Sequence, residues 1–192
     1  MLFRSIAGLG NPGRQYEQTW HNSGYQALDR LAARHRLPLE RIRFRALTAE
    51  GQIEGSPCLL VKPLTYMNLS GEAVREAARY YQIPAENILV IYDDIDLICG
   101  TIRIRRSGGP GTHNGMRSMI ECLGTQSFPR IRIGIGPKPD QWDLADFVLS
   151  KVQPDQNGLW SSAVDLAVEA AELVLKEGLS GAMATLNRRQ GL

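Results

Sequence analysis

Apolar residues follow two different spacings along this chain. Continuous apolar runs such as residues 87–92 are typical of strands that are covered on both faces. Residues 101–106 alternate isoleucine with arginine, which is typical of a strand with one wet, basic face. Together such runs predict strands over residues 3–9, 41–53, 58–62, 87–92, 101–106 and 130–135.

Between these runs, apolar residues recur every three or four positions, which predicts amphipathic helices. The predicted helices cover residues 22–36, 70–84, 114–123 and 159–178, and a short helix follows through residue 188. Strands that alternate with helices indicate an α/β fold, with a twisted mixed sheet and helices on both of its faces. The composition shows no break, so we expect residues 1–192 to form a single domain.

The composition narrows the class of protein. The three cysteines lie far apart and form no C-x-x-C pair, which disfavours both a disulfide framework and a zinc site. No stretch of the sequence approaches the roughly 18 apolar residues of a membrane span, and the first residues do not have the pattern of a signal peptide. We therefore expect a soluble cytoplasmic protein.

Basic residues are unevenly distributed, although the net charge is only +2. Six arginines and a single acid lie between Arg103 and Arg132, whereas residues 155–177 hold five acids and one lysine. The arginine-rich stretch is a candidate anion-binding face. A solvated basic surface without a partner is the alternative that charge alone leaves open.

Glycines at positions 8, 10 and 13 match the spacing of the dinucleotide-binding fingerprint. That motif requires a helix to begin inside it, but Pro12 and the polar residues that follow delay the predicted helix until Asn22. The acid that would bind a ribose is also missing, because Asp29 falls within the helix. The sequence therefore disfavours a nicotinamide or flavin site.

Polar side chains instead gather in four segments that follow or join strands, where α/β sheets commonly place their sites. The first contains Asn11, Tyr16, His21 and Asn22, and the second contains Tyr66 and Asn68. The third is residues 92–96, with three acids, and the fourth is the glycine-rich stretch 108–115. We expect these segments to converge on one edge of the sheet.

Five stretches in these regions closely resemble the signature segments of the bacterial peptidyl-tRNA hydrolase family. In chain order they are GLGNPGRQYEQTWHNSG, KPLTYMNLSGEAV, DDIDLICGTIRIR, GGPGTHNGMRSM and RIRIGIG. The resemblance implies a monomeric α/β ester hydrolase without a metal or organic cofactor. Its substrate would be peptidyl-tRNA, bound by the acceptor end, and its role would be to recycle tRNA from peptides released by the ribosome.

The resemblance also implies roles for individual residues. His21 matches the catalytic histidine, Asp93 the acid that orients it, and Asn11 a residue that holds the peptide. A histidine held by a carboxylate is a suitable base for activating water near neutral pH, and the chain has no G-x-S-x-G nucleophile motif. Matched substrate-binding residues are Tyr16, Tyr66, Asn68 and Asn114. The arginine-rich stretch, independently of the resemblance, makes Arg103, Arg105 and Arg132 the expected tRNA phosphate contacts.

Each assignment has a structural alternative. His21 can be a capping or packing residue, and Asn68 and Asn114 can simply cap helices. The role of His113 stays open, and Trp20 departs from the arginine usual at that position in the family. A further alternative for the whole chain is an RNA-binding homologue that has lost catalysis. The joint presence of Asn11, His21, Asp93 and Asn114 disfavours it.

Overall fold

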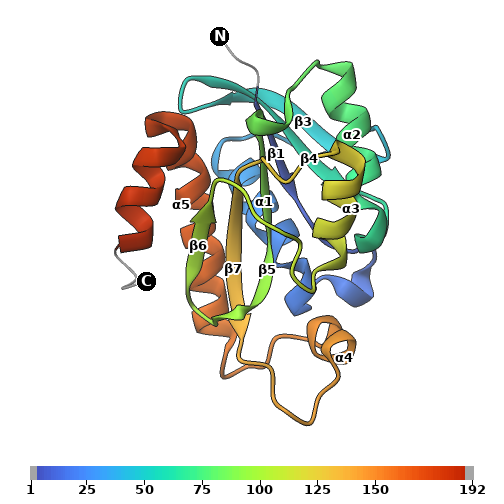
Figure 1. Cartoon of the computed structure of the whole chain (residues 1–192), viewed down its shortest axis with the longest axis vertical. Helices are drawn as coiled ribbons and strands as arrows, with labels where there is room; N and C mark the ends of the chain where they lie inside the picture. Colours follow the sequence, from blue (N-terminus) through green and yellow to red (C-terminus); the bar gives the residue numbers. More distant parts are fainter. Residues whose placement is uncertain (1–3, 189–192) are drawn as a thin grey trace.

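Seven strands form one mixed sheet in the computed structural model, which describes residues 4–188 (Figure 1). Their order across the sheet is β2-β3-β4-β1-β5-β7-β6. The central strands β4, β1, β5 and β7 run parallel, whereas β2, β3 and β6 each pair antiparallel with a neighbour. The strands are β1 (Arg4–Gly8), β2 (Arg41–Arg43), β3 (Ala46–Ile53), β4 (Ser56–Pro63), β5 (Ile88–Ile98), β6 (Ile102–Arg105) and β7 (Arg130–Gly136).

Helices cover both faces of this sheet, so the predicted fold class is confirmed. Helices α1 (Ser23–Arg34) and α5 (Asn157–Ala182) pack into one hydrophobic core, and α2 (Ser70–Tyr80) and α3 (Asn114–Leu123) pack into the core on the other face. Figure 1 shows these two layers on either side of the strands. Within residues 4–188, no helix combines the length and apolar character needed to cross a membrane.

Three features of the fold differ from the sequence prediction. Residues 41–53 form two strands rather than one, because Phe44 and Arg45 adopt positive φ angles of 55° and 54° and make a tight hairpin turn. Strand β5 continues to Ile98, so the acids expected in a loop lie on the strand. A short helix, α4 (Leu144–Leu149), occupies a segment for which no element was predicted.

The start of α1 lies unusually close to the central strands. A Cβ atom on Gly24 would stand 2.3 Å from the backbone oxygen of Ile91 and 2.6 Å from the backbone nitrogen of Leu9, so only glycine fits there. The preceding single turn, η2 (Trp20–Asn22), is thereby brought next to the middle of β5. This close approach places His21 beside Asp93.

Candidate active site

A cavity of about 1020 Å³ opens where the central parallel strands end, and it collects most of the residues singled out from the sequence. It is lined by the β1 loop, by η3 (Met67–Leu69) after β4, by β5 and by the glycine-rich segment before α3. Of the predicted site residues, Asn11, Tyr16, His21, Tyr66, Asn68, Asp93, Arg105, Asn114 and Arg132 line the cavity. Arg103 is not among the lining residues.

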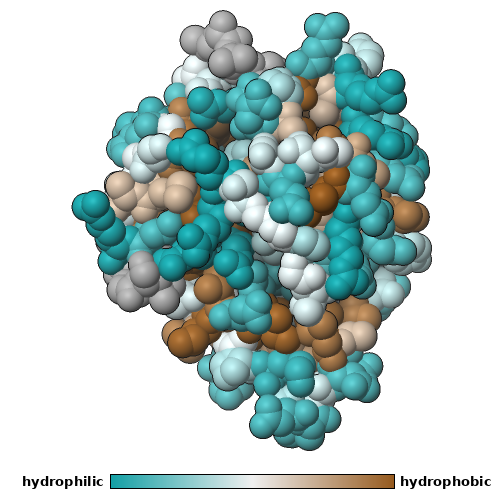
Figure 2. Space-filling view, viewed as in Figure 1, coloured by the Kyte–Doolittle hydropathy of each residue, from teal (hydrophilic) through white to brown (hydrophobic). Residues whose placement is uncertain are grey.

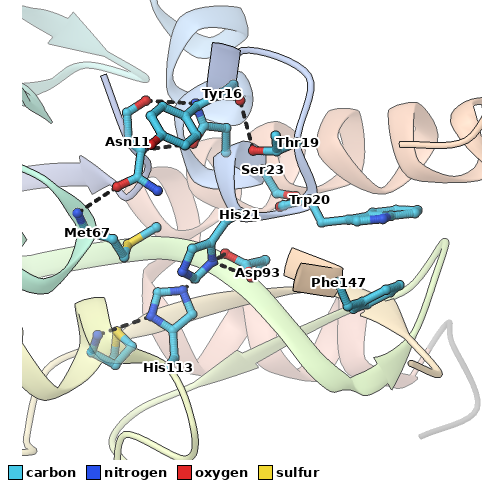
Figure 3. Close-up of polar contacts among 12 residues, drawn as sticks. Asn11, Tyr16, Thr19, Trp20, His21, Ser23, Met67, Asp93, His113 and Phe147 are labelled. Carbon is cyan, nitrogen blue, oxygen red and sulfur yellow. Dashed lines mark hydrogen bonds and ion pairs between the residues drawn. The ribbon is translucent and has the colours of Figure 1, made fainter. Parts of the chain in front are cut away.

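His21 and Asp93 form a buried pair that lines this cavity, and Figure 3 shows the contact between them. His21 Nδ1 lies 3.0 Å from Oδ1 and 2.9 Å from Oδ2 of Asp93, and the two residues are 8% and 2% exposed. When the proton of the neutral ring lies on Nδ1, it is donated to the carboxylate, and Nε2 is left as an acceptor. The pair can therefore hold the imidazole in the tautomer that a general base requires.

The carboxylate of Asp93 also faces a second histidine. His113 Nε2 lies 3.1 Å from Asp93 Oδ1, and the two imidazole rings are 4.7 Å apart. Burial alone would raise the pKa of Asp93, but the two histidines outweigh it and hold that pKa well below its usual range. Asp93 is therefore ionised at neutral pH. The sequence left the role of His113 open. The one sequence feature that points to a role is its position directly before the predicted helix, now α3.

Asn11 is fixed through both its backbone and its side chain. The side-chain amide of Asn22 accepts from the Asn11 backbone N–H at 2.8 Å and donates to its carbonyl at 3.0 Å. Asn11 Oδ1 in turn accepts from the backbone N–H of Met67 at 2.8 Å. Because the oxygen is engaged, the amide Nδ2 of Asn11 remains a donor on the cavity side (Figure 3). Such a donor can stabilise negative charge on a carbonyl oxygen.

The other amides and the two tyrosines lie around the mouth of the cavity. Asn68 and Asn114 are exposed at the starts of η3 and α3, and the Oδ1 atom of Asn114 accepts from Arg117 at 3.2 Å. Tyr66 is 58% exposed and Tyr16 is partly buried on the opposite loop. Exposed aromatic rings beside polar amides can stack on an unpaired base.

The arginines of β6 and β7 have three different environments. Arg132 Nε donates to Asp94 at 2.5 Å, and this carboxylate raises the pKa of Arg132 although burial acts in the opposite sense. Arg103 and Arg105 have no ion-pair partner among residues 4–188. Arg105 lines the cavity beside Arg132, so these two side chains can reach one bound anion.

Arg130 corrects the prediction of a uniformly wet basic face. Its side chain is 1% exposed and donates to the backbone carbonyls of Gly108, Gly109, Gln126 and Phe128, while its guanidinium lies over the Phe128 ring. Alternation of isoleucine and arginine gives no sign of this burial. Arg130 therefore anchors the glycine-rich segment instead of presenting a free charge.

Helix α4 adds an apolar wall that the sequence did not predict. Leu144, Val148 and Leu149 line the cavity, and Phe147 packs behind them against Trp20 with 5.8 Å between ring centroids. Figure 2 shows hydrophobic surface gathered in the lower part of this view, next to α4, while the face above is largely hydrophilic. One side of the cavity therefore suits apolar groups, whereas the other sides present amides, histidines and arginines.

Comparisons of sequence and of structure find similar proteins along almost the whole chain. A model of the family described as peptidyl-tRNA hydrolase matches residues 5–191. The chain is 48% identical over 183 residues to a peptidyl-tRNA hydrolase of Chloroflexus aggregans, which covers 95% of this chain and 97% of the relative. The crystal structure of the peptidyl-tRNA hydrolase of Acinetobacter baumannii superposes with a TM-score of 0.91 at 35% identity, over 96% of this chain and 94% of that one.

Proposed function

This chain belongs to the peptidyl-tRNA hydrolase family, and from that premise we propose that His21 is the general base of the reaction. The protein hydrolyses the ester that joins a peptide, or an N-blocked aminoacyl group, to the 3′-terminal ribose of tRNA. In the proposed mechanism Nε2 of His21 takes a proton from water as the water attacks the ester carbonyl. Asp93 holds the ring and stabilises the imidazolium that forms.

The observation that carries this proposal is the contact of His21 Nδ1 with both oxygens of a buried, ionised carboxylate. It sets the tautomer that leaves Nε2 free to accept a proton. Asn11 Nδ2 faces the same space and is suited to donate to the carbonyl oxygen as it gains charge. Base and donor lie together in one cavity, which is unexpected for a homologue that only binds RNA.

Substrate binding is assigned to the rim of the cavity. Asn68 and Asn114 offer amides to the peptide and the terminal ribose, and Tyr16 and Tyr66 offer rings to the unpaired bases of the acceptor end. Arg105 and Arg132 bind backbone phosphate, with Arg103 as a further contact along β6. Because one chain supplies every group, we propose a monomer. Its three free cysteines suit the reducing cytoplasm.

Single-turnover hydrolysis of N-acetylated aminoacyl-tRNA, measured against pH, tests the base assignment. His21→Ala should lower the rate by about 10²–10⁴ while leaving tRNA affinity nearly intact. The wild-type rate should rise with pH as His21 loses its proton. Asp93→Asn should be slower and should move that rise to lower pH, because the imidazolium loses its negative partner. Near-normal turnover of His21→Ala would refute the mechanism.

A further inference from the structure

Two histidines share one carboxylate in this active site, and they contact it through different ring nitrogens. Asp93 accepts from His21 Nδ1 and lies 3.1 Å from His113 Nε2, and all three residues are buried. His21 comes from η2, whereas His113 precedes α3, and Figure 3 shows the two rings next to each other beside the carboxylate. The proton positions on the two rings decide what this arrangement does.

The tautomer of His113 is set by the backbone of α3. The backbone N–H of Met116 donates to His113 Nδ1 at 3.2 Å, so this ring nitrogen is an acceptor and caps the helix. A neutral imidazole carries a single proton, which must then lie on Nε2 and is donated to Asp93. A second proton, on Nδ1, would point at the N–H of Met116. It would also place positive charge at the positive end of the α3 dipole.

Burial of the His113 ring also favours its neutral form. It lowers the pKa of His113 below its ordinary value even though Asp93 acts to raise it. The contact with Met116 and the burial of the ring therefore both favour the neutral form of His113. His21 has no such backbone donor on its free ring nitrogen in the contacts of the described chain.

The same proton arrangement bears on metal binding. Donor atoms of His21, Asp93 and His113 lie within 4.8 Å of one another, close enough to be drawn onto one ion. A metal on Nε2 of His113 would require the ring proton on Nδ1, where Met116 already donates. Sharing of the Asp93 carboxylate by two N–H groups accounts for the closeness of the three side chains better than a shared metal does.

We propose that His113 is a positioning residue that remains neutral, donates Nε2–H to Asp93 and thereby lowers the proton affinity of His21. This inference rests on the proposed base role of His21. A hydrogen bond to a carboxylate stabilises its negative charge, so less of that charge is available to stabilise imidazolium. Removing the hydrogen bond from His113 should therefore strengthen the stabilisation that Asp93 gives to a protonated His21.

Several charged groups around the site are held by partners of their own, whereas Arg105 and Asp96 line the cavity without an ion-pair partner among residues 4–188. Asp94 is bonded to Arg132, Arg130 is bonded to backbone carbonyls, and the Tyr92 ring packs 4.9 Å from His113 with its pKa raised by burial. Arg117 of α3 is exposed and bonded to Asn114. Changes confined to His113 should therefore be felt chiefly through Asp93.

Two isosteric substitutions separate the two hydrogen bonds of His113. His113→Asn places an amide oxygen near the position of Nδ1, so it can keep the cap on Met116 but cannot reach Asp93. His113→Gln places its amide nitrogen near the position of Nε2, so it can keep the donor to Asp93 while weakening the cap. We expect His113→Asn to move the rising limb of the pH–rate profile to higher pH by about 0.5–1 unit. His113→Gln should leave the limb near its wild-type position but lower the melting temperature.

Nitrogen-15 NMR of the imidazole rings provides the direct readout, since the chain has only three histidines. We expect the single proton of neutral His113 on Nε2 and the single proton of neutral His21 on Nδ1. A proton on Nδ1 of His113, or an unmoved rising limb in His113→Asn, would overturn the inference. If instead the wild type has no rising limb and His21→Ala is fully active, the base assignment itself fails.

Discussion

Helix α4 is attached to the rest of the protein mainly by one aromatic side chain. Phe147 is the buried residue of this six-residue helix, at 7% exposed, and its ring lies against Trp20 and Trp142. Backbone bonds from Trp20 to Ser150 and from Val152 to Gln18 fix only the segment that follows the helix. Replacing Phe147 with alanine should therefore release α4 while the sheet stays folded.

The size of the effect follows from the burial of the Phe147 ring. Burying a phenylalanine side chain contributes about 1.5–3 kcal/mol, so its loss should shift the docking equilibrium of α4 by roughly 10- to 150-fold. So short a helix has little stability of its own. If only the docked form binds substrate well, KM should rise by up to the same factor, and turnover at saturation should change far less because His21 and Asp93 stay in place.

Hydrogen exchange and steady-state kinetics together test this reasoning. Amides in residues 144–149 of Phe147→Ala should exchange faster, while those of β1 and β5 should keep wild-type protection. Leu149→Ala is the matched control, because Leu149 lines the same cavity but is 42% exposed and does not anchor the helix. Unchanged exchange in Phe147→Ala would refute the anchoring role. Faster exchange with an unchanged KM would show that α4 is not part of the substrate site.

Three further outcomes are expected. Because the folded-state pKa of Asp93 is depressed, this residue stabilises the fold above about pH 4 and loses that contribution as the pH falls. Acid unfolding, monitored by circular dichroism, should therefore be less pH-dependent in Asp93→Asn. Arg105→Ala and Arg132→Ala should each reduce the salt slope of log K for tRNA by about 0.7–0.9, whereas Arg106→Ala, whose guanidinium bonds Ser180, should not. Gly24→Ala should lower both the melting temperature and turnover, because the new Cβ would displace α1 and with it His21; wild-type values for both would contradict the packing argument.

The spacing of apolar residues predicted the strands and helices that pack against the core. It did not predict a turn with unusual backbone angles or a very short helix. Helix α3 was predicted to its ends, since its apolar spacing and its glycine boundary are both visible in the sequence. The turn at Phe44 and Arg45 was missed because it uses non-glycine residues at positive φ, which give no sequence signal. Helix α4 was missed because six residues with one buried side chain are too few to show a period.

The candidate site was predicted through residue types and resemblance, but its connections were not. Nothing in the sequence shows that the Asn22 side chain hydrogen-bonds the backbone of Asn11, or that the Met67 backbone N–H donates to the Asn11 side-chain oxygen. The sharing of Asp93 by His113 also joins strand β5 to the residue that precedes α3. Such contacts join positions far apart in the chain, so they exist only once the sheet has formed.

Charge on the β6–β7 pair shows how the fold divides arginines between structure and binding. Arg103 stands opposite Arg132, and Arg105 opposite Arg130, so like charges face each other across the strands at a cost in stability. On β7 that cost is offset, because Arg132 is bonded to Asp94 and Arg130 to backbone carbonyls. On β6 it is not, and the strand is held at the sheet edge by Asn187, whose side-chain amide bonds both the N–H and the C=O of Ile104. Arg103 and Arg105 therefore remain without a compensating negative charge on the edge strand. A phosphate bound there would reduce their repulsion with the arginines of β7.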